Sequence, residues 1–178
     1  MTDQELQQKR LVAAAIDIGV FVGLVLVFVI VRIILSLVMR SVTDSVMAHL
    51  MLRSGIELVT ALVTLGYILG RDVVLEGRSV GKKVMDIRVV TSAGKPIEFS
   101  DSMRRNAIFG VGSALSVIHG AIGMVPCFGT AIGCLMAPLL ILAFIFGVAA
   151  VVVEIIKFVT DAAGQRFGDQ WAGTKVVR

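Results

Sequence analysis

The chain has 178 residues, of which 57% are hydrophobic and 17% are charged, and its formal net charge is +4. A soluble globular domain averages about 45–50% apolar and about 25% charged residues. This composition therefore excludes a soluble enzyme, a disordered chain and a small disulfide-stapled toxin. The length favours one domain, and we expect it to cover residues 1–178.

Four apolar runs are long enough to cross a bilayer, which takes roughly 20 mostly apolar residues in a helix. We expect transmembrane helices at about 11–31, 56–75, 107–125 and 131–153. The first run is predicted to be a retained helix and not a cleaved signal peptide, because its small residues, Ala13 to Ala15, stand at its beginning.

The distribution of Lys and Arg predicts how the helices are oriented. Successive segments outside the four runs lie on opposite sides of the membrane. Counted in this way, fourteen of these residues lie on one side and three on the other. By the positive-inside rule, both termini, the loop at 76–106 and the tail at 157–178 are predicted to be cytoplasmic. Nucleic-acid binding is a poor explanation for the positive charge.

The connecting segments carry their own patterns. Apolar residues at helical spacing in 32–53 indicate either an amphipathic helix on the outer membrane surface or a continuation of the first helix. In the cytoplasmic loop, 83–90 and 97–99 read as two strands around a turn, and 173–177 is a further strand candidate. We therefore predict an all-α integral membrane protein, a four-transmembrane-helix bundle with a small cytoplasmic β-hairpin element.

Small residues are spaced four apart in or beside the apolar runs, which lets helix backbones approach closely in lipid. These pairs are Gly19 and Gly23, Gly66 and Gly70, and Gly129 and Gly133. They favour packing within one chain, and a homodimer interface is the alternative. Cys127 and Cys134, near the outer turn, are predicted to be buried thiols, with oxidation as the alternative.

The sequence contains no complete motif for catalysis or cofactor binding. The segment 77–83 has three residues between its glycines, where a phosphate-binding loop has four. Two histidines cannot furnish a typical zinc site, and no convincing pair of nucleophile and base is present. We expect no enzyme activity, no cofactor and no metal.

The ionisable residues within the spans are more informative, since an acid near the bilayer centre costs at least ~2.5–3.5 kcal/mol and needs a partner, a cavity or an ion path. Asp17 is either an exchanging carboxylate or a structural one held in a polar network. Glu57 and Glu154 are predicted to be interfacial anchors, whereas His119 is either a relay member or a single polar helix contact.

Four short motifs together resemble the RDD family of bacterial membrane proteins. They are 10–17, beginning at Arg10; 81–90; Arg105 with Asn106; and 166–177. The resemblance covers nearly the whole chain. The arginine and the two aspartates that name the family correspond to Arg10, Asp17 and Asp169.

Membership would imply a multi-pass protein of the bacterial inner membrane, with ligand transport or monovalent cation/proton antiport as suggested roles. We expect a small ion exchanger with Asp17 as its coupling group, acting as a homo-oligomer on monovalent cations or protons. The polar cluster would combine Asp17 with Arg10, Asp169 and Arg105, and Asp169 is expected to pair with one of the two arginines.

Arg88 and Lys82, which lie in the second motif, are secondary candidates beside His119 and Glu57. The alternative function is a non-transporting adaptor or assembly factor that uses the basic loop to bind a partner or anionic lipids. An intramembrane enzyme is a weaker third possibility.

Overall fold

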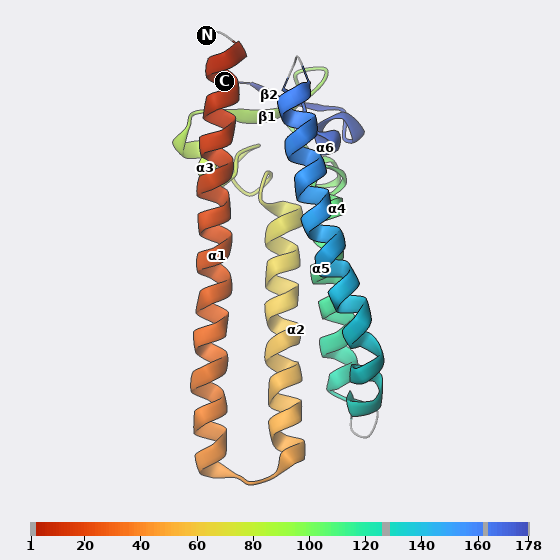
Figure 1. The fold of residues 1–178 in the computed structure, drawn as a ribbon. Coiled ribbons are helices and arrows are strands. Elements are labelled where there is room, and N and C mark those ends of the chain that lie inside the picture. The colour runs from red at the N-terminus through yellow and green to blue at the C-terminus, as the bar shows by residue number, and fades with distance from the viewer. Residues whose placement is uncertain (1–2, 126–128, 162–163, 178) are drawn as a thin grey trace. The chain divides into compact units, whose positions relative to one another are not determined.

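A computed structural model describes residues 3–125, 129–161 and 164–177 of the chain. The described residues form helices and two short strands, in the order α1 (Asp3–Val42), α2 (Val46–Gly70), α3 (Val80–Val84), β1 (Arg88–Thr91), α4 (Phe99–Gly123), α5 (Gly129–Thr160), α6 (Phe167–Trp171) and β2 (Thr174–Val177) (Figure 1). The order is two long helices, a short helix and a strand, and it occurs twice.

The four long helices are apolar and long enough to cross a membrane, so the predicted number of spans is confirmed. Their bounds differ from the predicted ones chiefly at the first connection. The segment 32–42 continues α1, and α2 already begins at Val46. Of the two alternatives for this region, the continuation of the first helix is therefore the correct one.

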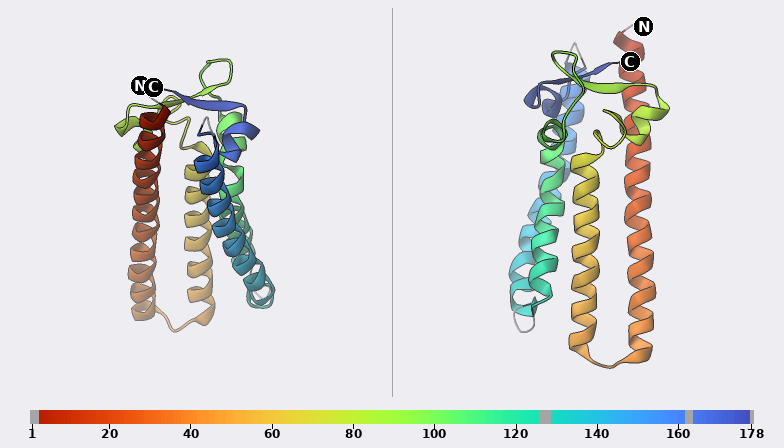
Figure 2. Two further views of the ribbon diagram at one scale, coloured as in Figure 1. Left: turned by 45° about the horizontal axis from the view of Figure 1, so that its top comes forward. Right: turned by 180° about the vertical axis from the view of Figure 1, so that it is seen from behind.

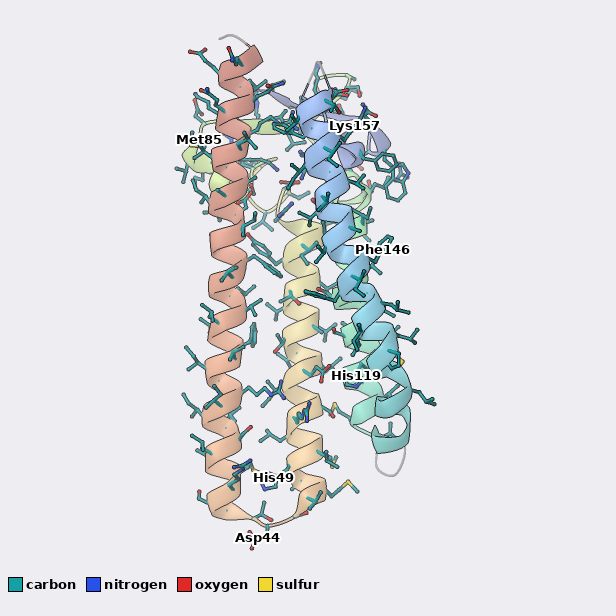
Figure 3. All side chains as sticks on the ribbon, viewed as in Figure 1. Asp44, His49, Met85, His119, Phe146 and Lys157 are labelled. Atoms are coloured by element: carbon teal, nitrogen blue, oxygen red, sulfur yellow. The ribbon has the colours of Figure 1, made fainter. Side chains whose placement is uncertain are left out.

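The residues fall into two compact units. The terminal unit comprises Met1–Phe21, Gly66–Gly110 and Gly147–Arg178, and the hairpin unit comprises Val22–Leu65 and Val111–Phe146. Figure 3 labels Asp44 at the turn between α1 and α2, His49 in the first turn of α2 and His119 along α4, all in the hairpin unit.

The small sheet joins the two halves of the sequence. β1 and β2 pair antiparallel, with Val89 opposite Val176 (Figure 2). The predicted β element is confirmed, but its pairing is not that of a hairpin. The proposed returning strand at 97–99 does not form, and only Pro96 before it makes an isolated bridge, with Val90. The C-terminal strand takes its place beside β1.

Apolar side chains under the sheet form the core of the terminal unit. The buried members of this core are Ala13, Ile87, Val89, Ile97 and Val176. Along β2, Thr174 and Val176 are buried whereas Lys175 between them is exposed, as expected for a strand with one covered face. The core contains residues from α1, from both strands and from the loop after β1, so it fastens the strands to the first helix.

Two ten-residue segments of the terminal unit are matched in sequence and in structure. Segments 81–90 and 168–177 each begin with glycine and end in two valines, after Arg88 in the first and Lys175 in the second. Each contains most of a short helix, a residue with positive φ and most or all of a strand. The positive-φ residues are Asp86 and Gly173, at equal positions in the two segments.

The predicted glycine pairs do not make close helix contacts within the described part of the chain. A Cβ on Gly19, Gly23 or Gly66 would meet nothing within 4 Å, and one on Gly70 would reach only the Phe99 ring. The side chains at 129–134 and the whole of 126–128 lie outside the described residues, and with them the predictions for Cys127 and Cys134.

Candidate functional site

Asp17, the predicted coupling carboxylate, caps the short helix α3. It is buried on α1, where its oxygens accept a hydrogen bond from the Ser79 hydroxyl at 2.5 Å and one from the Gly81 amide at 2.8 Å. The first amides of a helix have no partner within the helix, and the Ser79 side chain makes no cap bond of its own. A carboxylate on another helix therefore supplies the cap.

Glu154 plays the same part for α6. It is buried near the end of α5, and its two oxygens accept the amides of Phe167 and Gly168, each at 3.0 Å. The side chain, predicted to be an interfacial anchor, turns inward to the N-terminus of α6, where a negative charge is favourable. Each short helix thus receives a carboxylate from a long one.

Arg105 connects two further buried aspartates of the terminal unit, Asp72 and Asp169. Its side chain is 1% exposed, with Nε 2.7 Å from Asp169 Oδ1 and Nη1 3.5 Å from Asp72 Oδ2. A guanidinium offers donors in several directions from one plane, so one arginine on α4 can bind two carboxylates. Asp72 follows α2 and Asp169 lies on α6, so Arg105 ties both halves of the chain together.

Asp169 has the densest set of partners. Arg10 Nη2 lies 2.5 Å from its Oδ2, and the Arg166 amide donates to the same oxygen at 3.2 Å. Although burial would raise the pKa of Asp169, the charges of Arg105, Arg166 and Arg10 outweigh it and hold that pKa well below its ordinary value. Asp169 therefore stays ionised. It pairs with Arg10 and with Arg105, where the sequence predicted one of them.

Asp72 is the second buried acceptor. Lys82 Nζ donates to its Oδ1, and the Asn106 amide donates to its Oδ2 at 3.2 Å. Burial alone would raise the pKa of Asp72, but Lys82, Arg105 and Arg71 lower it well below its usual range. Burial has the larger effect on its partner and lowers the pKa of Lys82 to about 7, despite the adjacent carboxylate.

These contacts make one buried ion network, defined here as Arg10, Asp72, Lys82, Arg105 and Asp169. Buried charges must be paired to be tolerated, and removing one partner leaves the other uncompensated. The network joins α1, α3, α4 and α6 to Asp72, two residues after α2. It can hold these elements in place, and it presents carboxylates that already have cationic partners.

A separate ionisable pair lies in the hairpin unit. His119 Nδ1 on α4 is 2.6 Å from Glu57 Oε1 on α2, and the two side chains are 24% and 25% exposed. Glu57 lies eleven residues after the start of α2. It is therefore well inside the helix, which begins ten residues before the predicted span.

Glycine allows α2 and α4 to approach closely beside this pair. A Cβ on Gly120 would lie 2.8 Å from the Leu58 amide nitrogen, which is closer than such atoms come in proteins. Gly120 follows His119, and Leu58 follows Glu57. The close helix contact therefore stands directly next to the imidazole and the carboxylate and fixes their separation.

The structure thus brings together some of the predicted site residues and separates others. Arg10, Arg105, Asp169 and Lys82 share the buried ion network, whereas Asp17 binds Ser79 and Gly81. Arg88 is exposed at the start of β1. Glu57 and His119 form their own pair.

Sequence reasoning missed two parts of this arrangement. Asp72 and Asn106, which meet at 3.2 Å, were not among the candidates. Asn106 belongs to the quoted Arg105–Asn106 motif, and Asp72 is a charge at the end of an apolar run, so both carried a signal. Ser79 carried none, because its role depends on a carboxylate 62 positions earlier in the chain.

Among the described residues, no group of three or more His, Cys, Asp or Glu side chains could hold a metal ion. Comparisons with curated proteins and with solved structures gave no match. The model of the RDD family matches residues 7–173, a range that includes Arg10, Asp17 and Asp169. The match extends from the first turns of α1 to the residue before β2, so this chain, a membrane protein with four apolar helices, belongs to the RDD family.

Proposed function

We propose that this protein is a small secondary transporter of the monovalent cation/proton exchange class, in which the Glu57–His119 pair carries the proton. The observation behind the proposal is the 2.6 Å contact between an imidazole and a carboxylate on two membrane-spanning helices. Ionisable side chains in such helices are costly and mark ion pathways or proton relays more often than they serve packing.

The chemistry of the pair suits exchange. A carboxylate can bind either a proton or a monovalent cation, so the two compete for one site. An imidazole beside it can accept the released proton, since histidine changes charge near neutral pH. In the sequence of the hairpin unit, the other charged residues are Arg32, Arg40, Asp44 and Arg53, so Glu57 is its one glutamate.

We assign a structural role to Asp17 in this scheme. Its carboxylate has two donors, Ser79 and Gly81, and both belong to the helix that it caps. Binding a cation there would require at least one of these bonds to break and α3 to lose its cap. Of the two roles open from the sequence, the geometry supports the structural one.

The proposal includes a location and an assembly. With the positive-inside rule, the termini, the loop at 76–106 and the tail at 157–178 are on the cytoplasmic side, and the membrane is the bacterial inner membrane. Four helices enclose little space, so we propose that the transport path requires at least a dimer.

A non-transporting adaptor is the second candidate, and the sealed position of Asp17 supports it. A protein that only binds partners needs no exchanging group, and buried ion pairs would then serve to shape a docking unit. Its exposed basic residues include Lys83, Arg88, Lys95 and Arg104, which could bind an acidic partner or anionic lipid.

Ion flux in proteoliposomes tests the proposal. Purified protein is reconstituted with a pH-sensitive dye inside the vesicles and challenged with gradients of sodium, potassium or lithium. We expect cation-driven proton movement in the wild type, loss of it in Glu57→Gln and a strong reduction in His119→Gln. Glu98→Gln, which removes an exposed carboxylate of the same type before α4, is the matched control and should keep the flux.

Three outcomes contradict the proposal in different ways. If folded Glu57→Gln keeps the wild-type flux, the Glu57–His119 pair does not carry the proton. Flux lost in folded Asp17→Asn but kept in Glu57→Gln returns the coupling role to Asp17. Folded wild-type protein that shows no flux under any gradient favours the adaptor.

A further inference from the structure

The short helix α6 has one apolar face that nothing in the described chain covers. Phe167 and Trp171, one helical turn apart, are 53% and 60% exposed. The two residues after Phe167, Gly168 and Asp169, are buried. The helix therefore holds its polar network on one side and presents two aromatic rings on the other.

The matched helix α3 has the same asymmetry. Val80 and Phe167 directly precede the matched segments, and Val84 and Trp171 are the fourth residues within them. Both valines are exposed, Val84 at 65%. Gly81 and Lys82 are buried. Two short helices with different sequences thus expose apolar side chains at the same two positions, which indicates a common environment for the two faces.

Contacts with α2, α4 and α5 place both helices near the ends of membrane-spanning helices. α6 is held by Glu154, six residues before the end of α5, and by Arg105, six residues after the start of α4. α3 is capped by Asp17 of α1, and Lys82 binds Asp72, two residues after α2. A spanning helix crosses from hydrocarbon to headgroups near its ends, so these contacts favour that depth for both short helices.

We propose that the exposed faces of α3 and α6 insert into the headgroup–acyl boundary of the bilayer that the long helices cross. Trp is enriched at this depth because its ring is apolar and its N–H polar. Amphipathic helices bind there with the apolar face toward the acyl chains. A five-residue helix is too short to form alone in water, so the Asp17 and Glu154 caps are what keep the two faces formed.

Basic side chains around the two helices fit the same occupant. Lys83 on α3, Arg104 on α4 and Lys175 on β2 are exposed in the terminal unit. Cations at this depth can reach lipid phosphates while their stems cover apolar surface. The inference concerns how the terminal unit sits on lipid, and it holds for a transporter and for an adaptor alike.

The chain contains one tryptophan, Trp171, which makes the test direct. Full-length protein is reconstituted in phosphatidylcholine vesicles that contain lipid brominated either near the headgroup or near the end of the acyl chain. We expect Trp171 to emit at a shorter wavelength than free tryptophan. Lipid brominated near the headgroup should quench most of its fluorescence, and lipid brominated at the chain end should quench less of it.

Two variants made in a Trp171→Phe background complete the test. Val84→Trp reports on α3 and should be quenched in the same order as Trp171. Ala93→Trp, in the exposed turn after β1, is the aqueous control and should be quenched by added iodide and not by bromolipid. If Trp171 behaves as Ala93→Trp does, α6 faces water and the proposal is wrong; if only Val84→Trp does so, the boundary position fails for α3.

Discussion

The two matched segments of the terminal unit, α3 with β1 and α6 with β2, are built alike but carry opposite charges at one position. The third helical residue is Lys82 in the first and Asp169 in the second, and both are buried. Lys82 binds an aspartate that follows α2, whereas Asp169 binds arginines of α1 and α4. One backbone arrangement therefore accepts either sign, provided that the surrounding helices supply the other.

The two signs are not equivalent at this position. The first turn of a helix carries a partial positive charge, which favours an anion and disfavours a cation. Asp169 accepts the Arg166 amide in this turn, and its pKa is held far below the ordinary value by three arginines. Burial lowers the pKa of Lys82 to about 7. We infer that the α6 segment contributes more to stability through its charge than the α3 segment does.

Removing the two charges separately gives the largest expected effect. Asp169→Asn leaves Arg10 and Arg105 without their shared carboxylate, and breaking such a buried pair costs about 3–5 kcal/mol. Lys82→Met keeps the length of the side chain, and Asp72 retains Arg105 and Asn106 as partners. The Lys82→Met variant should therefore lose clearly less stability than Asp169→Asn. Thermal unfolding in detergent measures both, and equal losses would refute the inferred asymmetry.

The pH dependence of unfolding sharpens the same comparison. The pKa of Asp169 is lowered in the folded protein by its arginine partners, against about 3.9 in an unfolded chain. Its contribution to the free energy of unfolding is therefore complete above about pH 4 and is lost as the pH falls below that value. Asp169→Asn should flatten this acid limb, and an unchanged limb would mean that other carboxylates, such as Asp72, account for it.

The glycines that begin the matched segments predict the next largest effect. A Cβ on Gly81 would collide with the Ala13 carbonyl, and one on Gly168 with the Arg105 carbonyl, so each short helix packs against the backbone of a long one. Helix backbone cannot move aside, and we expect each alanine variant to lose about 3 kcal/mol, the upper part of the range for overpacking.

Gly19→Ala is the control for these substitutions. It lies on α1 in the same unit, where a Cβ would meet nothing within 4 Å in the described chain. Alanine is the better helix former, so this variant should be neutral or slightly stabilised in thermal unfolding. If Gly81→Ala or Gly168→Ala loses no more stability than Gly19→Ala, the close packing is not needed for the match between the two segments.

Much of the fold could be predicted from the sequence, because the signals are local. Apolar runs of spanning length depend only on composition along the chain. The pairing of β1 with β2 could not be predicted in this way, because the nearer candidate at 97–99 offered an equally short strand next to a turn. Ile97 packs in the core, but this region contributes only the isolated bridge between Pro96 and Val90.

The site shows the same division. The pairing of Asp169 with arginine followed from the motifs that resemble the RDD family, and the structure contains it. The roles of Asp17 and Glu154 did not, because a carboxylate that caps a distant helix has no fixed spacing in sequence. The ten-residue match between 81–90 and 168–177 was visible in the letters, and it is the signal that could have placed the two short helices in equivalent positions.

The smallest expected effect separates the two caps. Glu154 accepts two backbone amides, so the amide group of Glu154→Gln turns a donor toward one of them and leaves that buried N–H unsatisfied, at a cost of about 1–2 kcal/mol. Asp17 accepts one amide and the Ser79 hydroxyl. That hydroxyl can rotate and accept a hydrogen bond from the new amide, so Asp17→Asn should lose less.

Adding Ser79→Ala tests this explanation of the difference, since it removes the group that accommodates the Asp17→Asn amide. The two changes together should then cost more than the sum of the separate losses, a coupling that a double-mutant cycle measures by thermal unfolding. Strict additivity would mean that the hydroxyl does not adapt. The carboxylate from α1 and the one from α5 would then cap their helices in the same way, and the two matched segments would differ in stability only through the charges of Lys82 and Asp169.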